Sequence, residues 1–195
     1  MRRAVSRNHM LNSCVGIDDG PFVPRKLGGH QAPLLAVRLE GPRLVSACTG
    51  WLKIDGTDGT QRAGQLVKRL MMTKCPILLA GVTFGGFNLI DPCILHNVFR
   101  VPVLVVVGSR PDNKAVKRAL VKHFPDWKER WEIVRSLGPL RKARTIRNES
   151  PIFYESFGCT PRRAREILAR CAFVARVPEP LRVAGLVASG LFPLA

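Results

Sequence analysis

Two adjacent carboxylates, Asp18 and Asp19, follow the apolar run 14–17. That run predicts a short strand, which Gly20 and Pro21 end, because glycine frees φ and proline has no N–H to add to a ladder. Neighbouring acids in a basic chain repel each other unless a cation or hydrogen-bond donors offset their charge. Mg²⁺ takes such oxygen ligands from the end of a rigid strand. The stretch therefore indicates either a metal site or a solvated Asp-Asp-Gly turn.

Carboxylates in this position can hold one or two Mg²⁺ ions, which activate a water molecule and neutralise negative charge. Asp55, Asp58 and Asp91 are further candidates. Two of them have structural alternatives, because Asp58 stands where a helix cap is expected and Asp91 precedes Pro92, a common start of a turn.

The spacing of apolar residues predicts the elements that must position these acids. Unbroken or alternating apolar runs indicate strands, and apolar residues at helical spacing indicate helices. The predicted strands span residues 14–17, 33–40, 44–54, 77–82, 101–107 and 152–156. The predicted helices span residues 62–72, 92–99, 113–124, 126–137, 160–174 and 179–191, with a basic connector at 141–147.

The order of these elements predicts an α/β fold with a mixed sheet. An antiparallel three-strand meander, extended by parallel strands through helical crossovers, is the ribonuclease H-like arrangement; here helices flank it and extra helices follow at the C-terminal end. In that fold, acids from strand one, from the region around the first helix and from strand four meet at one edge. Asp18 and Asp19 take the first place, and Asp55 and Asp58 the second. Strand four contains no acid, and Asp91 follows only after the next loop.

A strongly basic composition indicates the class of partner. The chain of 195 residues suits a single domain, placed at residues 11–195 after a basic, mobile arm at 1–10. The formal charge is +17, and residues 110–147 hold 12 Lys and Arg against 4 Asp and Glu. A polyanion is the expected partner, because binding neutralises phosphates and releases counterions. A membrane surface and plain solubility are the alternatives.

Six cysteines lie far apart and form no C-x-x-C pair, which argues against a zinc site and a redox motif. We expect buried free thiols. No apolar signal-peptide core follows the first arginines, and the longest apolar stretch, 181–195, is too short to span a bilayer. We therefore expect a soluble, cytoplasmic protein with no membrane partner, while its oligomeric state is left open.

Several stretches resemble one protein family. They are VGIDDGPF (15–22), IDGTDGT (54–60), ILLAGVTFGGFNLID (77–91), VPVLVVVGSRPDN (101–113), ALVKHFPDWKERW (119–131) and VPEPLRVAG (177–185). Together they are similar to the archaeal endonuclease dU family, a distant relative of endonuclease V, and the likeness runs from about Cys14 to the C-terminus. The resemblance implies a ribonuclease H-like fold and a metal-dependent endonuclease that acts at deaminated bases, notably deoxyuridine, in DNA.

The resemblance also sharpens the choice of site residues. The expected catalytic carboxylates are Asp18, Asp58 and Asp91. The expected ligands of Mg²⁺, or of Mn²⁺ in its place, are Asp18, Asp19, Asp55 and Asp58.

One position departs from the family. Ala80 stands where relatives, and endonuclease V, are expected to place an acid. Either Asp91 or a second acid near Asp18 completes the metal site, or this chain has weak or no nuclease activity.

Two groups of residues are expected to meet the nucleic acid. Asn88 follows two glycines and is a candidate donor to a phosphate or to an extruded base, while Phe84 and Phe87 either wall a base pocket or pack in the core. The DNA backbone is expected to contact basic side chains whose alternative is a solvated helix surface: Lys114, Lys117, Arg118, Lys122, Lys128, Arg130, Arg141, Lys142 and Arg144.

The leading hypothesis is a Mg²⁺-dependent DNA repair endonuclease that incises near deoxyuridine or a similar deaminated base. One alternative is a non-catalytic nucleic-acid-binding protein that kept the fold after losing the acid of strand four. A nuclease directed at RNA is the other.

Overall fold

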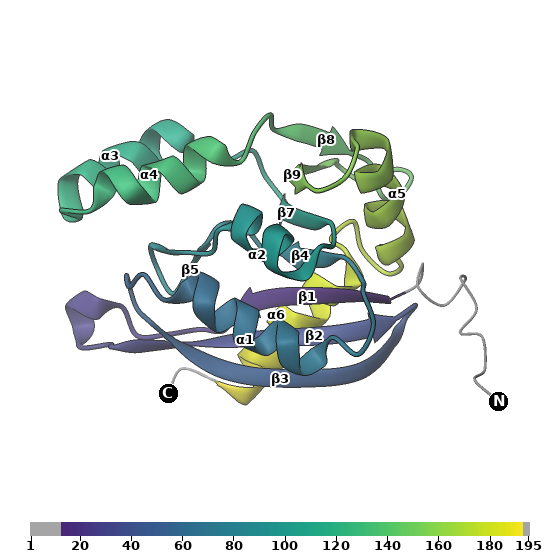
Figure 1. The fold of residues 1–195 in the computed structure, drawn as a ribbon, viewed down its shortest axis with the longest axis horizontal. Helices are drawn as coiled ribbons and strands as arrows, with labels where there is room; N and C mark the ends of the chain where they lie inside the picture. Colours follow the sequence, from purple (N-terminus) through teal and green to yellow (C-terminus); the bar gives the residue numbers. More distant parts are fainter. Residues whose placement is uncertain (1–12, 193–195) are drawn as a thin grey trace.

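The computed structural model describes residues 13–192, so the arm predicted at residues 1–10 lies outside the described residues. Within this range, seven strands form one mixed sheet in the order β3-β2-β1-β4-β7-β9-β8, and two short strands form a separate hairpin, β5-β6 (Figure 1). The sheet strands are β1 (Ser13–Asp19), β2 (Gln31–Glu40), β3 (Arg43–Lys53), β4 (Ile77–Leu79), β7 (Val103–Val107), β8 (Arg141–Ala143) and β9 (Ile152–Phe157). The hairpin strands are β5 (Thr83–Phe84) and β6 (Asn88–Leu89).

Seven helical segments of the described residues connect and cover these strands. They are the 3-10 turn η2 (Arg25–Leu27) and the helices α1 (Gly59–Leu70), α2 (Pro92–Phe99), α3 (Asn113–His123), α4 (Trp127–Ser136), α5 (Pro161–Cys171) and α6 (Glu179–Leu191). None of the helices within residues 13–192 has both the length and the apolar character needed to cross a membrane.

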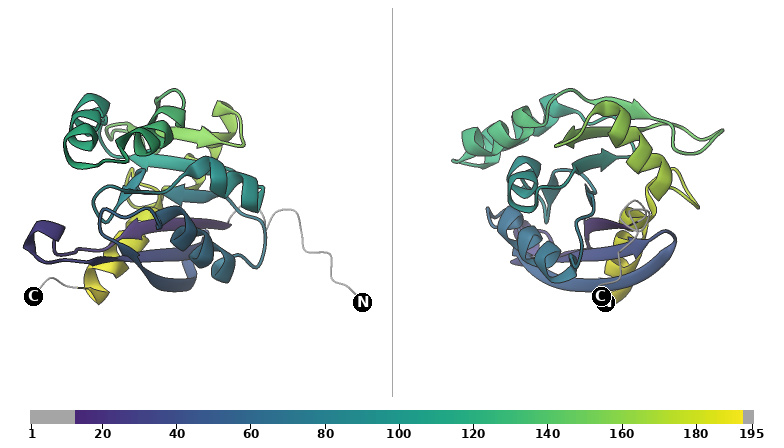
Figure 2. Two further views of the ribbon diagram at one scale, coloured as in Figure 1. Left: turned by 60° about the vertical axis from the view of Figure 1, so that its left-hand side comes forward. Right: turned by 45° about the vertical axis from the view of Figure 1, so that its right-hand side comes forward.

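The sheet has the predicted topology. β1, β2 and β3 form an antiparallel meander, β4 runs parallel to β1, and β7 runs parallel to β4. β9 then pairs with β7 in the antiparallel direction, and β8 forms the far edge. The sheet is twisted, so its β2–β3 end and its β8–β9 end face different directions (Figure 2).

Helices cover both faces of the sheet. Val15 and Ile17 of β1 face one core cluster with residues of α1 and α2, whereas Cys14 faces a second cluster with residues of α5. Helix α6 crosses the back of β1 and β2 and forms a third cluster there (Figures 1 and 2). Strand side chains alternate between faces, so the two adjacent aspartates of β1 enter different layers.

The structure corrects two predicted segments. The strand predicted at 77–82 ends at Leu79, because the chain turns at Gly81, where φ is +103°. The basic connector predicted at 141–147 contains β8, a polar edge strand that pairs with β9. Its sequence, Arg-Lys-Ala, carries little apolar signal, which is why the strand is not predicted from the sequence. The six cysteines are free, as predicted, but only three of them are buried: Cys48 and Cys159 are half-buried, and Cys93 is exposed.

Helix α6 approaches β1 unusually closely. A Cβ added at Gly16 would lie 2.3 Å from the backbone carbon of Pro180, and one at Gly20 would lie 3.2 Å from the backbone oxygen of Ala188. Asp18 stands between these glycines on the same face, opposite Gly185 of α6. The two glycines therefore let the helix lie against the strand and leave Asp18 as the side chain that β1 presents between them.

We predict that Gly16→Ala lowers the free energy of unfolding by about 3 kcal/mol, because the new methyl group meets backbone atoms that cannot move aside alone. The matched control is Gly64→Ala in α1, whose Cβ would meet its nearest neighbour at 3.9 Å. That change should stabilise the protein by about 0.5–1 kcal/mol, since alanine favours a helix interior over glycine. Urea denaturation measures both; equal effects of the two substitutions would contradict the close contact.

Candidate active site at the end of the first strand

The side chains of Asp18 and Asp19 leave the end of β1 on opposite faces of the sheet. Asp18 lies on the α6 face, where its Oδ1 accepts a hydrogen bond from the Asp19 backbone N–H at 3.0 Å. Its Oδ2 has no hydrogen-bond donor among residues 13–192 and points toward Gly185, where an added Cβ would lie 2.7 Å away. On the opposite face, Asp19 Oδ2 accepts a hydrogen bond from the Gly85 N–H at 2.6 Å. One oxygen of Asp18 is thus free for a ligand.

A cavity of about 540 Å³ adjoins these carboxylates. Its walls come from the ends of β1, β4 and β7 and from α6, and they include Asp18, Ala80, Arg182 and Ser189. The Arg182 guanidinium is paired with Glu179, one turn earlier in the same helix. The cavity is large enough to admit a phosphodiester group, with Asp18 on its wall.

Burial dominates the electrostatics of this acid pair. It raises the pKa of Asp18 to about 7, with a further upward contribution from the charge of Asp19 and a downward one from the Asp19 N–H. Burial likewise raises the pKa of Asp19, while the Gly85 N–H opposes the rise. Holding both groups ionised at neutral pH therefore calls for a positive charge nearby, because each carboxylate has lost much of its water.

Ala80 lies directly beside Asp18. Ile17 of β1 pairs with Leu79 of β4, and the Ala80 N–H donates to the Ile17 carbonyl at 3.0 Å. The next residues along the two parallel strands are therefore Asp18 and Ala80, and both line the same cavity. The departure noted in the sequence thus places a methyl group where an acid would adjoin Asp18.

The β5-β6 hairpin engages two of the predicted metal ligands. Its loop runs from Gly85 to Phe87, with φ of +51° at Gly85 and +86° at Gly86. Asp19 accepts from the Gly85 N–H, and Asp55 Oδ1 accepts from the Phe87 N–H at 2.9 Å. A Cβ at Gly86 would lie 2.3 Å from Asp55 Oδ1, so only glycine fits there without a shift. The two carboxylates hold the loop at both of its ends.

Asp58, at the start of α1, binds the same hairpin through Asn88 of β6. Asp58 Oδ1 accepts from Asn88 Nδ2 at 2.7 Å and from the Lys53 N–H at 3.1 Å, and its Oδ2 pairs with Arg62 at 3.2 Å. Partial burial acts to raise the pKa of Asp58, but the hydrogen bonds from Asn88, Lys53 and Arg62 outweigh it, and the pKa is lowered. Asp58 stands at the N-cap position of α1 but makes no side-chain cap hydrogen bond.

The predicted nucleic-acid contact of Asn88 needs correction. Its side chain is 0% exposed, and its amide also donates to the Lys53 carbonyl and accepts from the Gly59 N–H. All of its hydrogen-bonding groups are engaged within the protein, so it has nothing left to offer a phosphate or a base. Asn88 joins the hairpin to α1 instead.

Asp91 has a structural role, although as a helix cap rather than as the turn residue considered as its alternative. Its Oδ1 accepts from the backbone N–H groups of Cys93 at 2.8 Å and Ile94 at 3.3 Å, which makes it the N-cap of α2. Within the described range, no three His, Cys, Asp or Glu side chains come together in an arrangement able to hold a metal ion. The structure therefore does not gather Asp18, Asp58 and Asp91 into one carboxylate cluster.

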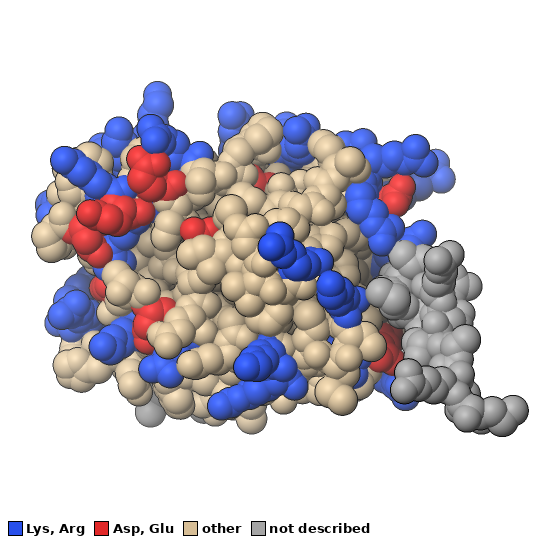
Figure 3. Space-filling view, in the orientation of Figure 1, with Lys and Arg blue, Asp and Glu red and all other residues tan. Residues whose placement is uncertain are grey.

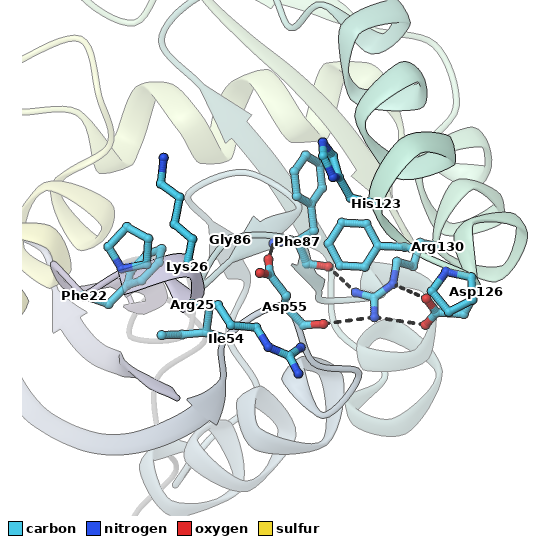
Figure 4. Close-up of a pocket in the computed structure, with 13 residues that line it drawn as sticks. Phe22, Arg25, Lys26, Ile54, Asp55, Gly86, Phe87, His123, Asp126 and Arg130 are labelled. Carbon is cyan, nitrogen blue, oxygen red and sulfur yellow. Dashed lines mark hydrogen bonds and ion pairs between the residues drawn. The ribbon is translucent and has the colours of Figure 1, made fainter. Parts of the chain in front are cut away.

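A second and larger cavity, of about 800 Å³, lies beside the hairpin loop, with Gly86 and Phe87 among its walls; we call it the aromatic cavity (Figure 4). Phe22, Phe87 and Phe124 line it, and the Phe87 and Phe124 rings are 5.4 Å apart. Asp55 adds a carboxylate to the wall, with a left-handed backbone at φ +56° that is uncommon for residues other than glycine. Phe84, by contrast, is buried in the core, which is the second of its two predicted alternatives.

Arg130 fixes the wall of this second cavity, so its predicted role as a DNA contact also needs correction. The side chain is buried, and its guanidinium donates to the carbonyls of Asp55, Gly56 and Phe87 at 3.0, 2.9 and 2.6 Å (Figure 4). It also pairs with Asp126 at 2.9 Å. A buried guanidinium bound to three carbonyls ties α4 to the hairpin and to the turn after β3.

The remaining predicted DNA contacts are accessible. Lys and Arg side chains gather along the edge of the molecule over α3, α4 and α5, whereas the surface over α2 is largely uncharged (Figure 3). Of the predicted set, all but the half-exposed Arg141 and the buried Arg130 are exposed; the exposed ones are Lys114, Lys117, Arg118, Lys122, Lys128, Lys142 and Arg144.

Sequence reasoning missed one further acid. Glu155 lies in β9 opposite Val105, is buried, and has its pKa raised to about 7 by burial. The available signal was an acid inside a strand with buried neighbours. It lines neither cavity, so we assign it no part in the site.

The chain is similar to a known protein family and to several of its members. The family model described as Endonuclease dU matches residues 12–192. The chain belongs to the Endonuclease dU family. A UPF0215 protein of Thermococcus gammatolerans is 36% identical over 180 residues, which cover 91% of this chain and 90% of the relative.

Solved structures confirm the predicted fold. An Archaeoglobus fulgidus protein is 28% identical, with a TM-score of 0.81 over 93% of this chain and 99% of its own. Endonuclease V of Ciona intestinalis, solved with an inosine-containing DNA, is 17% identical, with a TM-score of 0.59 over 92% of this chain and 85% of its own. This member of the Endonuclease dU family therefore has a ribonuclease H-like fold that it shares with endonuclease V.

We predict that Asp91→Ala lowers the free energy of unfolding by about 1 kcal/mol, because the first turn of α2 loses its cap. Asp91→Asn should stay within about 0.5 kcal/mol of wild type, since asparagine caps a helix nearly as well. Neither change should alter the affinity for Mn²⁺. Urea denaturation and metal titration test this; weaker Mn²⁺ binding by Asp91→Asn would show that the carboxylate charge itself is required.

Proposed function

We propose that this protein is a metal-dependent endonuclease that incises DNA near deoxyuridine or another deaminated base. The observation that carries the proposal is Asp18, a partly buried carboxylate at the end of the central strand whose free oxygen adjoins an open cavity. Burial and the neighbouring Asp19 raise its pKa to about 7. A partly buried carboxylate with a raised pKa, placed at the end of a strand, is a functional-site candidate, because its negative charge needs a cation or a proton to offset it.

The donor set fits a divalent cation that the substrate helps to hold. Mg²⁺ commonly takes one or two protein carboxylates, several waters and the oxygens of a substrate phosphate. Asp18 would supply the carboxylate, because Asp19 leaves the strand on the opposite face, where the Gly85 N–H holds it, and Asp55, Asp58 and Asp91 are engaged in the hairpin and in a helix cap. When bound, such an ion supplies a Lewis acid that activates water and neutralises charge on the phosphate.

The other residues of the site bind and orient the DNA strand. The exposed lysines and arginines of α3 and α4 attract the phosphate backbone, which brings the scissile bond to the rigid end of β1. The Gly85 N–H holds Asp19 in place, and α6 holds Asp18, so both carboxylates are positioned before a substrate arrives.

Ala80 favours one alternative, a nucleic-acid-binding protein without catalysis. A second carboxylate beside Asp18 would strengthen the metal site, and the methyl group of Ala80 leaves that place without a ligand. One carboxylate, several waters and a substrate phosphate are nevertheless sufficient to hold Mg²⁺, so catalysis is kept with a weaker metal affinity.

The test is incision of labelled DNA that carries one deoxyuridine, with Mg²⁺ or Mn²⁺ and at pH 8, where Asp18 is mostly ionised. Wild type should cut, and Asp18→Asn should lower the rate by about 100-fold or more, because a ligand is lost while the shape is kept. Ala80→Asp should lower the Mn²⁺ concentration needed for half-maximal incision, whereas the uncharged Ala80→Asn should not.

The controls separate the alternatives. An RNA strand of the same sequence with uridine tests an RNA-directed activity. Salt-sensitive binding of DNA without any incision, by wild type and by Ala80→Asp alike, would overturn the catalytic proposal and favour the binding protein.

A further inference from the structure

We propose that the aromatic cavity beside the hairpin binds an extruded nucleobase that has a ring N–H next to a carbonyl. Asp55, in the wall of this cavity, accepts the hydrogen bond from that N–H. The inference rests on the proposed function, since it concerns how a deaminated base in DNA would be read. It assigns Asp55 to recognition of the base rather than to the metal.

The cavity has the size and the walls that a base requires. Its volume of about 800 Å³ lies within the usual range of small-molecule sites. Phe22, Phe87 and Phe124 reach it from three separate segments, the loop after β1, the β5-β6 hairpin and the turn between α3 and α4. Aromatic rings are the usual stacking partners of bases taken out of a helix.

The rim carries positive charge. Arg25 and Lys26 of η2, and His123 at the end of α3, line the opening and are exposed (Figure 4). Cationic groups around an apolar pocket suit a ligand that is apolar on its faces and carries phosphates on either side. A nucleotide within a strand has that character.

Asp55 is held in a fixed orientation. Its N–H donates to the Gly85 carbonyl at 2.9 Å, its carbonyl accepts from Arg130, and its Oδ1 accepts from the Phe87 N–H. No donor among residues 13–192 bonds its Oδ2. The left-handed backbone of Asp55 is uncommon among residues other than glycine, although aspartate and asparagine adopt it more readily than most.

The acceptor at Asp55 fits what deamination changes. Cytosine N3 and adenine N1 are hydrogen-bond acceptors, whereas the corresponding ring nitrogens of uracil and hypoxanthine carry a hydrogen. A carboxylate oxygen accepts from that N–H, and it leaves a cytosine N3 facing another acceptor without a proton between them. Thymine shares the ring N–H of uracil, so Asp55 does not separate these two; in a duplex, thymine paired with adenine costs more to extrude than mismatched uracil.

The test measures binding to short single-stranded oligonucleotides in EDTA, so that metal and incision play no part. Each strand carries one deoxyuridine, one deoxycytidine or one N3-methyldeoxyuridine. Wild type should prefer deoxyuridine to deoxycytidine by about tenfold, which is the value of one charge-assisted hydrogen bond. N3-methyldeoxyuridine, which lacks the N–H, should lose that preference. Equal affinities for all three strands would overturn the inference.

The variant Asp55→Asn should reverse the binding preference rather than only remove it. The Phe87 N–H would keep the amide oxygen turned toward the loop, so the amide NH₂ would take the place of Oδ2. A donor then faces the base, and the preference should reverse in favour of deoxycytidine. Asparagine tolerates a left-handed backbone well, so the variant should fold. The matched control is Asp112→Asn, the same change of charge at the exposed cap of α3, which should keep the wild-type preference.

The outcomes distinguish this inference from the proposed function. Asp18→Asn should keep the preference for deoxyuridine in binding although it loses incision. Preferential binding of deoxyuridine without incision would support the inference and contradict the nuclease. An unchanged preference in Asp55→Asn would overturn the inference and leave the nuclease standing.

Discussion

The close approach of α6 to β1 is the constraint on which the site depends. Gly16 and Gly20 have no side chain to separate the strand from the helix, and Asp18 lies between them against Gly185. A carboxylate placed there loses much of its water, which is why its pKa rises to about 7. The packing of the C-terminal helix against β1 thus also accounts for the raised pKa of Asp18.

The hairpin explains why the other acids differ from Asp18. Asp19 and Asp55 accept hydrogen bonds from the two ends of the Gly85–Phe87 loop, and Asp58 reaches it through Asn88. Each of these contacts gives the carboxylate an N–H donor from the protein, which Asp18 Oδ2 lacks among residues 13–192. The loop also lines the aromatic cavity through Gly86 and Phe87, whereas the cavity at Asp18 is lined by the ends of β1, β4 and β7 and by α6.

The amino-acid pattern was sufficient for most of the fold but for less of the site. The apolar runs at β1, β2, β3 and β7 and the helical spacing of α1 are local signals, and the structure confirms them. Helix α2 was also predicted with its observed bounds. Strand β8 was missed because its pairing with β9 depends on tertiary contacts rather than on an apolar pattern.

The roles of the aspartates depend on backbone geometry that spacing does not encode. Asp55 and Asp58 stand near one another in the chain as two metal ligands could, yet a left-handed φ turns Asp55 toward the Phe87 N–H. Arg130 resembles its exposed neighbours in the sequence, but three carbonyls brought together by the fold bury it. The position of Ala80, unlike the roles of the aspartates, follows from the sequence. The parallel register of β1 and β4 places it beside Asp18.

The central claim is that a divalent cation binds at Asp18 rather than among the acids of the hairpin. Anomalous diffraction from crystals of the wild-type protein soaked with Mn²⁺ at pH 8 tests it most directly. The account predicts a manganese peak within coordination distance of the Asp18 carboxylate, and its loss in Asp18→Asn. A peak at Asp55, Asp58 or Asp91 with none at Asp18 would contradict the account.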